Sequence, residues 1–199
     1  MMANPQNPPT IVQNSHDSVR TELEAMFETD QQGRLDIKTA EERYGHFSPE
    51  VAALWKKQNM NDEKNRKRLI EIIDQSGWPK QSVVGEKAAI SAFLVLQHAH
   101  LDLQKLYLPL LRSAAVAGEV KLNWLALLED RVLVGEGKKQ LYGSQLRGKK
   151  DVEGWQLEPI EDEVNVDERR AKMGLGPLAE YLKGFGIEYR KPNKPAPNP

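Results

Sequence analysis

The segment FLVLQHAHLD, residues 93–102, places an imidazole and a carboxylate at a spacing that could support acid–base chemistry. His98 and Asp102 are four residues apart, so both side chains lie on one side of a helix that continues through the segment. A neighbouring carboxylate fixes which imidazole nitrogen carries the proton, as in general acid–base sites. A buried histidine held by a carboxylate for structural reasons gives the same spacing, so the pattern leaves both roles open.

Polar residues also interrupt the apolar stripe of the segment 48–77. At 3.6 residues per turn, Gln58, Asp62 and Asn65 fall between apolar positions at both ends of this stripe. Burying an unpaired amide or carboxylate costs about 2–7 kcal/mol, so inward-facing groups need partners or a polar cavity. One hypothesis is that the three side chains face the region of His98. The alternative is a helix break at which Asp62 caps a second helix.

A third polar group lies in the C-terminal half. Asp130 and Arg131 fall inside an apolar run near the end of a predicted helix. Tyr142 and Gln145 follow two glycines. Guanidinium groups bind carboxylates and phosphates in a planar, bidentate geometry, so Arg131 or Arg170 could hold an anionic group. A surface ion pair is the other role open to these charged residues.

Helices must position most of these side chains. We predict a mainly α fold, a compact bundle of about five to seven helices with one short β-hairpin near 139–160. Helical periodicity and cap signals predict the main helices, the first ending at Gly33 and the next running from the Ser48 cap to Gly77. Alternating residues predict the hairpin strands at about 139–146 and 154–160. We expect a single domain over 15–190, a disordered N-terminal arm over 1–14 and a disordered Pro-rich tail over 191–199.

Composition excludes several classes of protein. The 28 basic and 29 acidic residues give a net charge of −1, which argues against a nucleic-acid partner. No apolar run reaches the ~18 residues of a membrane span. Cysteine is absent, and the four histidines form no HExxH motif, so we expect no metal site and no cofactor. The first residues lack the pattern of a signal peptide, and we expect a soluble, cytoplasmic protein.

Several sequence blocks resemble a bacterial family catalogued as a domain of unknown function. The blocks are GWPKQSVVGEKAA (77–89), LQHAHLD (96–102), LEDRVLVGEGKKQLYGSQ (128–145) and PIEDEVNVDERRAKMGLGPLAEYL (159–182). The resemblance also takes in DQQGR (30–34) and DEKNRKRL (62–69). It implies a compact domain and supplies neither substrate nor cofactor. Most of the polar residues singled out above fall inside these blocks.

The residues favour a site that acts on a small polar molecule or a peptide. In this hypothesis His98 is the acid or base, and an arginine binds an anionic group. The catalytic candidates are His98, Asp102 and Asp62. The ligand-binding candidates are Gln97, Asp130, Arg131, Tyr142, Gln145 and Arg170. The hairpin and the helix end at Asp130 are predicted to close this site from the other side.

The alternative is a non-catalytic helical interaction module, of the accessory or immunity type. In that case the same polar groups form an internal network that fixes one packing arrangement, and the partner is a protein. A pocket beside His98 would distinguish the two hypotheses.

Overall fold

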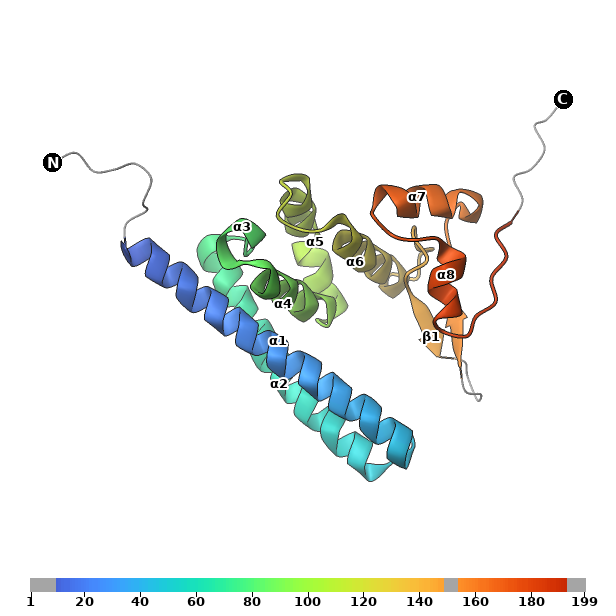
Figure 1. Ribbon diagram of the computed structural model, residues 1–199, viewed down its shortest axis with the longest axis horizontal. Helices are drawn as coiled ribbons and strands as arrows, with labels where there is room; N and C mark the ends of the chain where they lie inside the picture. Colours follow the sequence, from blue (N-terminus) through green and yellow to red (C-terminus); the bar gives the residue numbers. More distant parts are fainter. Residues whose placement is uncertain (1–9, 149–153, 193–199) are drawn as a thin grey trace. The chain divides into compact units, whose positions relative to one another are not determined.

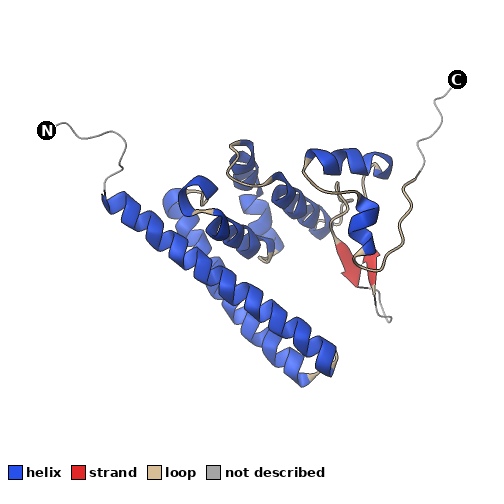
Figure 2. Cartoon of the chain, in the orientation of Figure 1, coloured by secondary structure: helices blue, strands red, loops and turns tan. Residues whose placement is uncertain are grey.

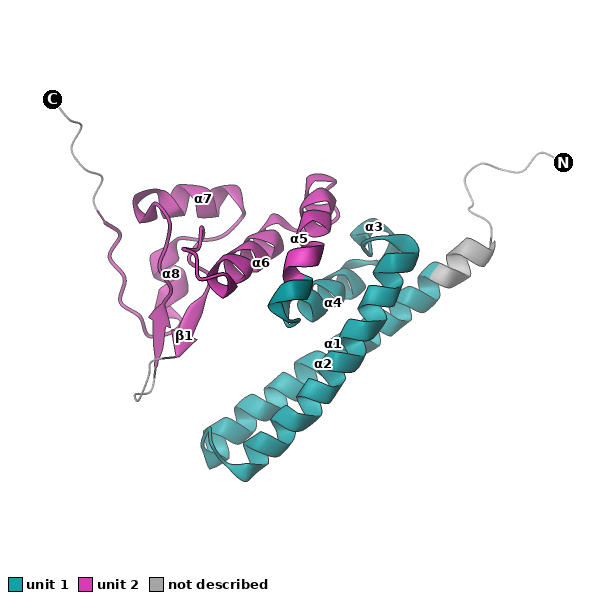
Figure 3. Ribbon diagram, turned by 180° about the vertical axis from the view of Figure 1, so that it is seen from behind, with its two compact units in different colours: residues 1–103 teal, residues 104–199 magenta. Residues whose placement is uncertain are grey.

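A computed structural model describes residues 10–148 and 154–192, with side chains described from residue 16. The chain divides into two compact units, residues 1–103 and 104–199 (Figure 3). The mainly α fold with one short antiparallel hairpin is confirmed (Figure 2). The predicted single domain over 15–190 stays a prediction.

Two long helices dominate unit 1 and run side by side in opposite directions (Figure 1). Helix α1 spans Thr10–Tyr44 and α2 spans Pro49–Ser76. The predicted boundaries of α2 are confirmed, because Ser48 Oγ accepts a hydrogen bond from the backbone N–H of Val51, and Gly77 follows the last turn. Since α2 is continuous, the predicted alternative of a break capped by Asp62 is wrong.

Helix α1 does not end at Gly33 as predicted. It continues to Tyr44 and buries Ile37 and Ala40 beyond the glycine. It also begins at Thr10, inside the segment expected to form the arm. Of the predicted arm and tail, residues 1–9 and 193–199 lie outside the described residues.

A short helix and an apolar helix complete unit 1. Helix α3 spans Gln81–Val84 and α4 spans Glu86–Gln97. Helix α4 packs against both α1 and α2, which explains why residues on most of its circumference are apolar and buried. It ends at Gln97, and α5 begins only at Leu101, so the segment around His98 is not one continuous helix.

Unit 2 combines short helices with the hairpin. The boundary between the units falls in the first turn of α5, which spans Leu101–Val116. The remaining elements of unit 2 are α6 (Leu122–Gly135), β1 (Leu146–Gly148), β2 (Trp155–Leu157), the 3-10 helix η1 (Glu163–Asn165), α7 (Val166–Lys172) and α8 (Leu178–Lys183). Ile160, Val166, Leu178 and Leu182 form an apolar core beneath the hairpin and the last two helices.

The strands are shorter than predicted. Strands β1 and β2 pair antiparallel, with Leu146 opposite Leu157 and Gly148 opposite Trp155. Most of the predicted first strand, residues 139–145, is a loop whose one ladder contact is an isolated bridge from Gln140 to Ile160. The alternation of residue types over 139–145 therefore does not result from strand pairing.

Candidate functional site

Helices α1, α2 and α4 bring six polar side chains together inside unit 1. We call this set the histidine cluster; its members are Asp30, Arg34, Gln58, Asp62, Asn65 and His98. Two pairs, Asp30 with Arg34 and Gln58 with Asp62, have a four-residue spacing, so each pair occupies one face of its helix. The two faces meet where α1 packs along α2.

Within the histidine cluster, His98 is paired with Asp30. The imidazole Nδ1 lies 3.2 Å from Asp30 Oδ1. The carboxylate side chain is 3% exposed, whereas 21% of the imidazole is exposed, so the ring joins a buried charge to the surface. A neutral imidazole that donates from Nδ1 carries its lone pair on Nε2, the basic nitrogen.

Arg34 bridges the two carboxylates of the cluster. Its Nε donates to Asp30 Oδ1 at 3.0 Å, and its Nη2 donates to both oxygens of Asp62 at 3.2 and 3.0 Å. The Nε2 of Gln58 donates to Asp62 Oδ1 at 2.7 Å. The hypothesis that Gln58, Asp62 and Asn65 face inward agrees with this arrangement, because Gln58 and Asn65 are buried and Asp62 binds Gln58.

Asp30 stays ionised although it is buried. Burial acts to raise its pKa, but the hydrogen bonds and charges of His98 and Arg34 outweigh burial and lower the pKa to about 2. The imidazole therefore has a permanent negative acceptor at neutral pH.

A glycine in α1 makes room for the cluster. A Cβ placed on Gly33 would lie 1.9 Å from Gln58 Oε1, so another residue there would displace the amide. Glycine costs about 1 kcal/mol relative to alanine inside a helix. Here its missing side chain allows the amide of Gln58 to reach between Asp30 and Asp62.

A small recess adjoins His98. It is lined by Asp30, Asp62, Asn65, Val95 and His98 and is too narrow to admit a water molecule. Two buried atoms of the histidine cluster, Gln58 Oε1 and Asn65 Nδ2, have no hydrogen-bond partner within the described part of the chain. An unpaired buried polar group costs about 1–3 kcal/mol, so these two atoms are the least satisfied part of the cluster.

The structure gives His98 a different carboxylate partner from the one predicted. Asp102 lies in the first turn of α5, beyond the break after Gln97, so the single helix assumed for the His98–Asp102 pair is wrong. Asp102 as a catalytic residue stays a prediction. Gln97, a predicted ligand-binding residue, is buried on the last turn of α4.

Sequence reasoning missed Asp30 and Arg34. Asp30 occupies the buried stripe of α1 with Leu23, Met26 and Ile37, the same kind of misplaced polar position that identified Gln58 in α2. The prediction that α1 ended at Gly33 cut this stripe short. Continuing the periodicity past the glycine would have revealed Asp30 as a polar residue between apolar ones.

A second polar cluster, in unit 2, is built around Asp130. Its carboxylate accepts hydrogen bonds from the backbone N–H groups of Leu141, Tyr142 and Ser144 at 2.7, 3.0 and 2.9 Å. Asp130 is fully buried, and burial raises the pKa of this carboxyl above its ordinary value, although the backbone donors act to lower it. We call this arrangement the Asp130 cluster, and it fixes the loop 140–145.

Two glutamine side chains continue the loop's hydrogen bonding. Gln140 is fully buried; its Nε2 donates to the carbonyls of Gln145 and Glu158, and its Oε1 accepts from the backbone N–H of Gln145 at 2.8 Å. The side chain of Gln145 donates to Ser144 Oγ at 3.0 Å. Gln145, a predicted ligand-binding residue, thus has partners inside the loop.

The arginines of this half have structural partners. Arg170 is 2% exposed, and its Nε and Nη1 donate to the carbonyls of Gly176 and Tyr142 at 2.6 and 2.7 Å. Its guanidinium also lies 5.2 Å from the ring centroid of Tyr181. Arg131, next to Asp130 on α6, is partly buried and also interacts with other groups. The contacts of Arg170 hold the loop in place, and its predicted role in ligand binding stays a prediction.

Tyr142 extends the Asp130 cluster toward Glu129. Its hydroxyl donates to Glu129 Oε2 at 3.1 Å, and Glu129 also pairs with Arg112. Burial and the nearby carboxylates raise the pKa of Tyr142 to about 12, so the phenol remains protonated. The predicted convergence of these residues with His98 on one pocket stays a prediction, since the two clusters belong to different units.

The chain is thus a mainly helical protein with a buried carboxylate–imidazole pair. It belongs to a family of unknown function (DUF6624), whose match covers residues 17–190 and confirms the resemblance seen in the sequence. No curated protein and no solved structure matches the chain.

Two further findings concern the described ranges, 10–148 and 154–192. No helix there is long and apolar enough to cross a membrane. No group of three or more metal-ligating side chains is found in the same residues.

Proposed function

We propose that the histidine cluster is an acid–base site in which His98 exchanges a proton with a small polar molecule or a peptide. The observation that carries this proposal is the 3.2 Å contact between Nδ1 of His98 and the buried, ionised Asp30. An ionised carboxylate at Nδ1 orients the ring, directs the lone pair to Nε2 and stabilises the imidazolium that forms when Nε2 accepts a proton.

Arg34 and Asp62 serve as positioning residues in this proposal. The guanidinium holds both carboxylates at about hydrogen-bond length, which keeps Asp30 ionised and in place. Asp62 lines the recess beside His98 and is the second carboxylate within it. Such preorganisation lets a general base work without rearranging its surroundings during the reaction.

One observation favours the alternative, a non-catalytic interaction module. The recess at His98 admits no water-sized sphere, as expected of a polar network that only fixes the packing of three helices. Two observations weigh against a purely structural cluster. Gln58 Oε1 and Asn65 Nδ2 have no hydrogen-bond partner in the described residues, and 21% of the His98 side chain is exposed.

The first test is the tautomer of His98. Long-range ¹H–¹⁵N spectra of the imidazoles should show His98, when neutral, protonated on Nδ1. The same spectra of Asp30→Asn should show this preference reduced. A neutral His98 protonated on Nε2 would contradict the proposed role.

The second test is turnover. A panel of small amides, esters, phosphate esters and dipeptides is screened with wild type, His98→Gln and His100→Gln. His100 is exposed and two residues away, so it is a matched control for the substitution. Loss of a general base lowers turnover roughly 10²–10⁴-fold, which we expect for His98→Gln alone. Equal turnover by both variants would leave the interaction module as the better proposal.

A further inference from the structure

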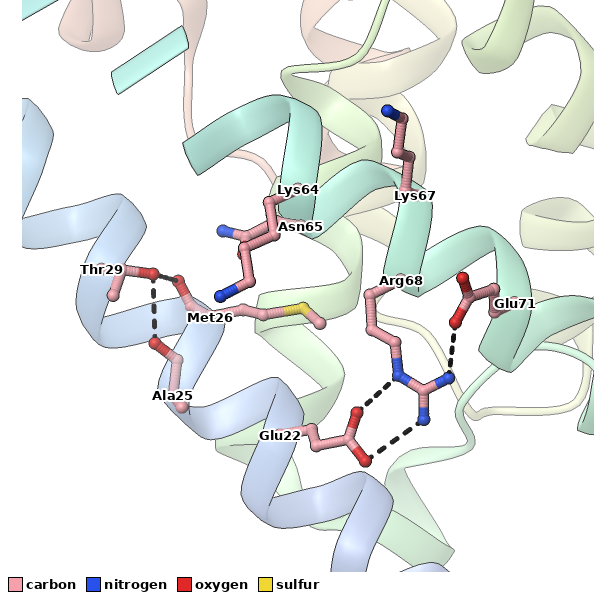
Figure 4. A pocket seen from close by; sticks show the side chains of 9 residues that line it. All are labelled: Glu22, Ala25, Met26, Thr29, Lys64, Asn65, Lys67, Arg68 and Glu71. Atoms are coloured by element: carbon pink, nitrogen blue, oxygen red, sulfur yellow. Dashed lines mark hydrogen bonds and ion pairs between the residues drawn. The ribbon is translucent and has the colours of Figure 1, made fainter. Parts of the chain in front are cut away.

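A groove runs between α1 and α2 on the surface of unit 1 (Figure 4). It encloses about 530 Å³, within the range of roughly 300–1,000 Å³ typical of small-molecule sites. Its lining includes Glu22, Met26, Lys64, Asn65, Arg68 and Glu71. Asn65 also lines the recess at His98, so the groove and the recess adjoin at this side chain.

The charges of the groove are unevenly compensated. Arg68 is neutralised by two carboxylates, Glu22 at 2.6 Å and Glu71 at 2.8 Å. These three side chains form a closed ion-pair group along one part of the wall (Figure 4). Lys64 differs, because no carboxylate of the described residues lies within ion-pair distance of its ammonium.

The amide of Asn65 adds a second donor beside Lys64. Asn65 is 7% exposed, and its Nδ2 has no hydrogen-bond partner in the part of the chain that the structure describes. In Figure 4 the nitrogen ends of Lys64 and Asn65 point to the same side, toward α1. An ammonium and an amide N–H group that point to the same side of a groove are suited to one anionic group.

The floor of the groove is apolar. The side chain of Met26 lies across it between the two helices, with Ala25 on the same helix (Figure 4). A thioether adapts to varied apolar shapes, so it can pack against the uncharged part of a ligand. The groove thus offers one end that binds an anion and a floor that binds carbon.

We propose that this groove binds the carboxylate or phosphate group of a small molecule through Lys64 and Asn65. The inference rests on the proposed function, since Asn65 lines both the groove and the recess at His98 and so places the bound anion next to the proposed acid–base residue. It also moves the anion-binding role from Arg131 and Arg170, where the sequence suggested it, to a lysine and an amide of α2.

The test is a titration of ¹⁵N-labelled protein with sodium phosphate and, separately, with sodium acetate. Ionic strength is held constant with chloride, because exposed charges are screened by salt. We expect saturable shifts of the Asn65 side-chain NH₂ signals and of backbone amides near Thr29 and Lys64. Saturation by phosphate alone assigns the site to phosphoryl groups, and saturation by acetate alone assigns it to carboxylates.

Matched variants identify the binding groups. Lys64→Gln should weaken anion binding at least about fivefold, the effect of roughly 1 kcal/mol. Lys38→Gln removes the same charge from an exposed site on α1 and should leave binding unchanged. Asn65→Ala should also weaken binding, and its amide spectrum reports whether the variant folds. If Asn65→Ala does not fold, the Lys64→Gln and Lys38→Gln pair alone decides.

The result that would overturn the inference is the absence of saturable shifts in the groove with either anion. Equal weakening by Lys64→Gln and Lys38→Gln would overturn it too, because the effect would then follow net charge alone. If neither anion gives saturable shifts but neutral His98 is protonated on Nδ1, the groove proposal is rejected and the acid–base site is kept. If an anion binds in the groove but neutral His98 is protonated on Nε2, only the acid–base site is rejected.

Discussion

The two polar clusters of this protein bury charge in different ways. In unit 1, Asp30 and Asp62 bind side chains, namely Arg34, Gln58 and His98. In unit 2, Asp130 binds backbone N–H groups of one loop. A carboxylate that binds backbone donors determines the course of the chain. A carboxylate that binds side chains holds groups that can still exchange protons or accept a ligand.

The difference extends to unpartnered atoms. Among the described residues, Gln58 Oε1 and Asn65 Nδ2 of the histidine cluster are buried without a partner, whereas the buried atoms of Asp130, Gln140 and Arg170 all have partners. The other unpartnered buried atoms lie outside both clusters and belong to Trp78, Ser91 and Tyr189. Buried polar groups in native proteins are nearly always satisfied, so each exception needs an explanation. The two clusters thus differ in that only the histidine cluster contains unpartnered buried atoms, which agrees with the proposed site there and with a structural role for the Asp130 cluster.

The largest expected effect tests the structural half of this comparison. Asp130→Ala leaves three backbone N–H groups of buried or half-buried residues unpaired. At about 1 kcal/mol or more each, the free energy of unfolding should fall by roughly 3 kcal/mol. Urea denaturation measures the loss, and hydrogen exchange should show the amides of residues 140–145 losing protection first. The control Glu180→Ala, at an exposed site on α8, should change stability by less than about 0.5 kcal/mol. A loss under about 1 kcal/mol for Asp130→Ala would mean that the loop does not depend on this carboxylate.

The next effect is a pH dependence in the histidine cluster. The pKa of Asp30 is lowered to about 2 in the folded protein, against about 3.9 in an unfolded chain. A lowered folded-state pKa contributes stability that is full above the unfolded value and is lost as pH falls toward the folded one. Wild type should therefore exceed Asp30→Asn by about 2 kcal/mol at pH 6, and the difference should shrink between about pH 4 and pH 2.

Denaturation of both proteins at several pH values measures this difference. Asp36→Asn, at an exposed position on the same helix, is the matched control and should give a small difference at every pH. If the difference between wild type and Asp30→Asn stays constant down to pH 2, the carboxylate is not held ionised by its partners.

The smallest effect concerns the glycine beneath the cluster. Gly33→Ala should displace the Gln58 amide, and this cost should offset the gain of up to about 1 kcal/mol in helix propensity. In a Gln58→Ala background the clash is absent, so Gly33→Ala should stabilise the protein by about 1 kcal/mol. A double-mutant cycle measures the coupling, which we expect to be about 1 kcal/mol or more. Additive effects of the two substitutions would show that Gly33 is not there to accommodate Gln58.

Local signals in the sequence determined much of the fold. Helix α2 begins after Ser48, with Pro49 as its first residue, and ends before Gly77, as predicted, because capping depends on residues adjacent in the chain. The apolar stripe of the same helix also identified Gln58 and Asn65 as buried polar residues, since helical periodicity is itself local. The choice of His98 and Asp62 as site candidates came from the same kind of reasoning, and their role stays a proposal.

Only the tertiary structure decided which groups are partners. Asp30 and His98 are 68 residues apart, and their pairing follows from the packing of α4 on α1, which no local pattern encodes. Gly33 resembles a helix stop locally, but the helix continues through it, and a Cβ at this position would lie 1.9 Å from the Gln58 amide of the neighbouring helix. Residues 139–145 alternate like a strand but form a loop, because Asp130 binds backbone N–H groups that a partner strand would otherwise have bound. A buried carboxylate takes whichever donors the packing brings to it, and that competition is settled in three dimensions.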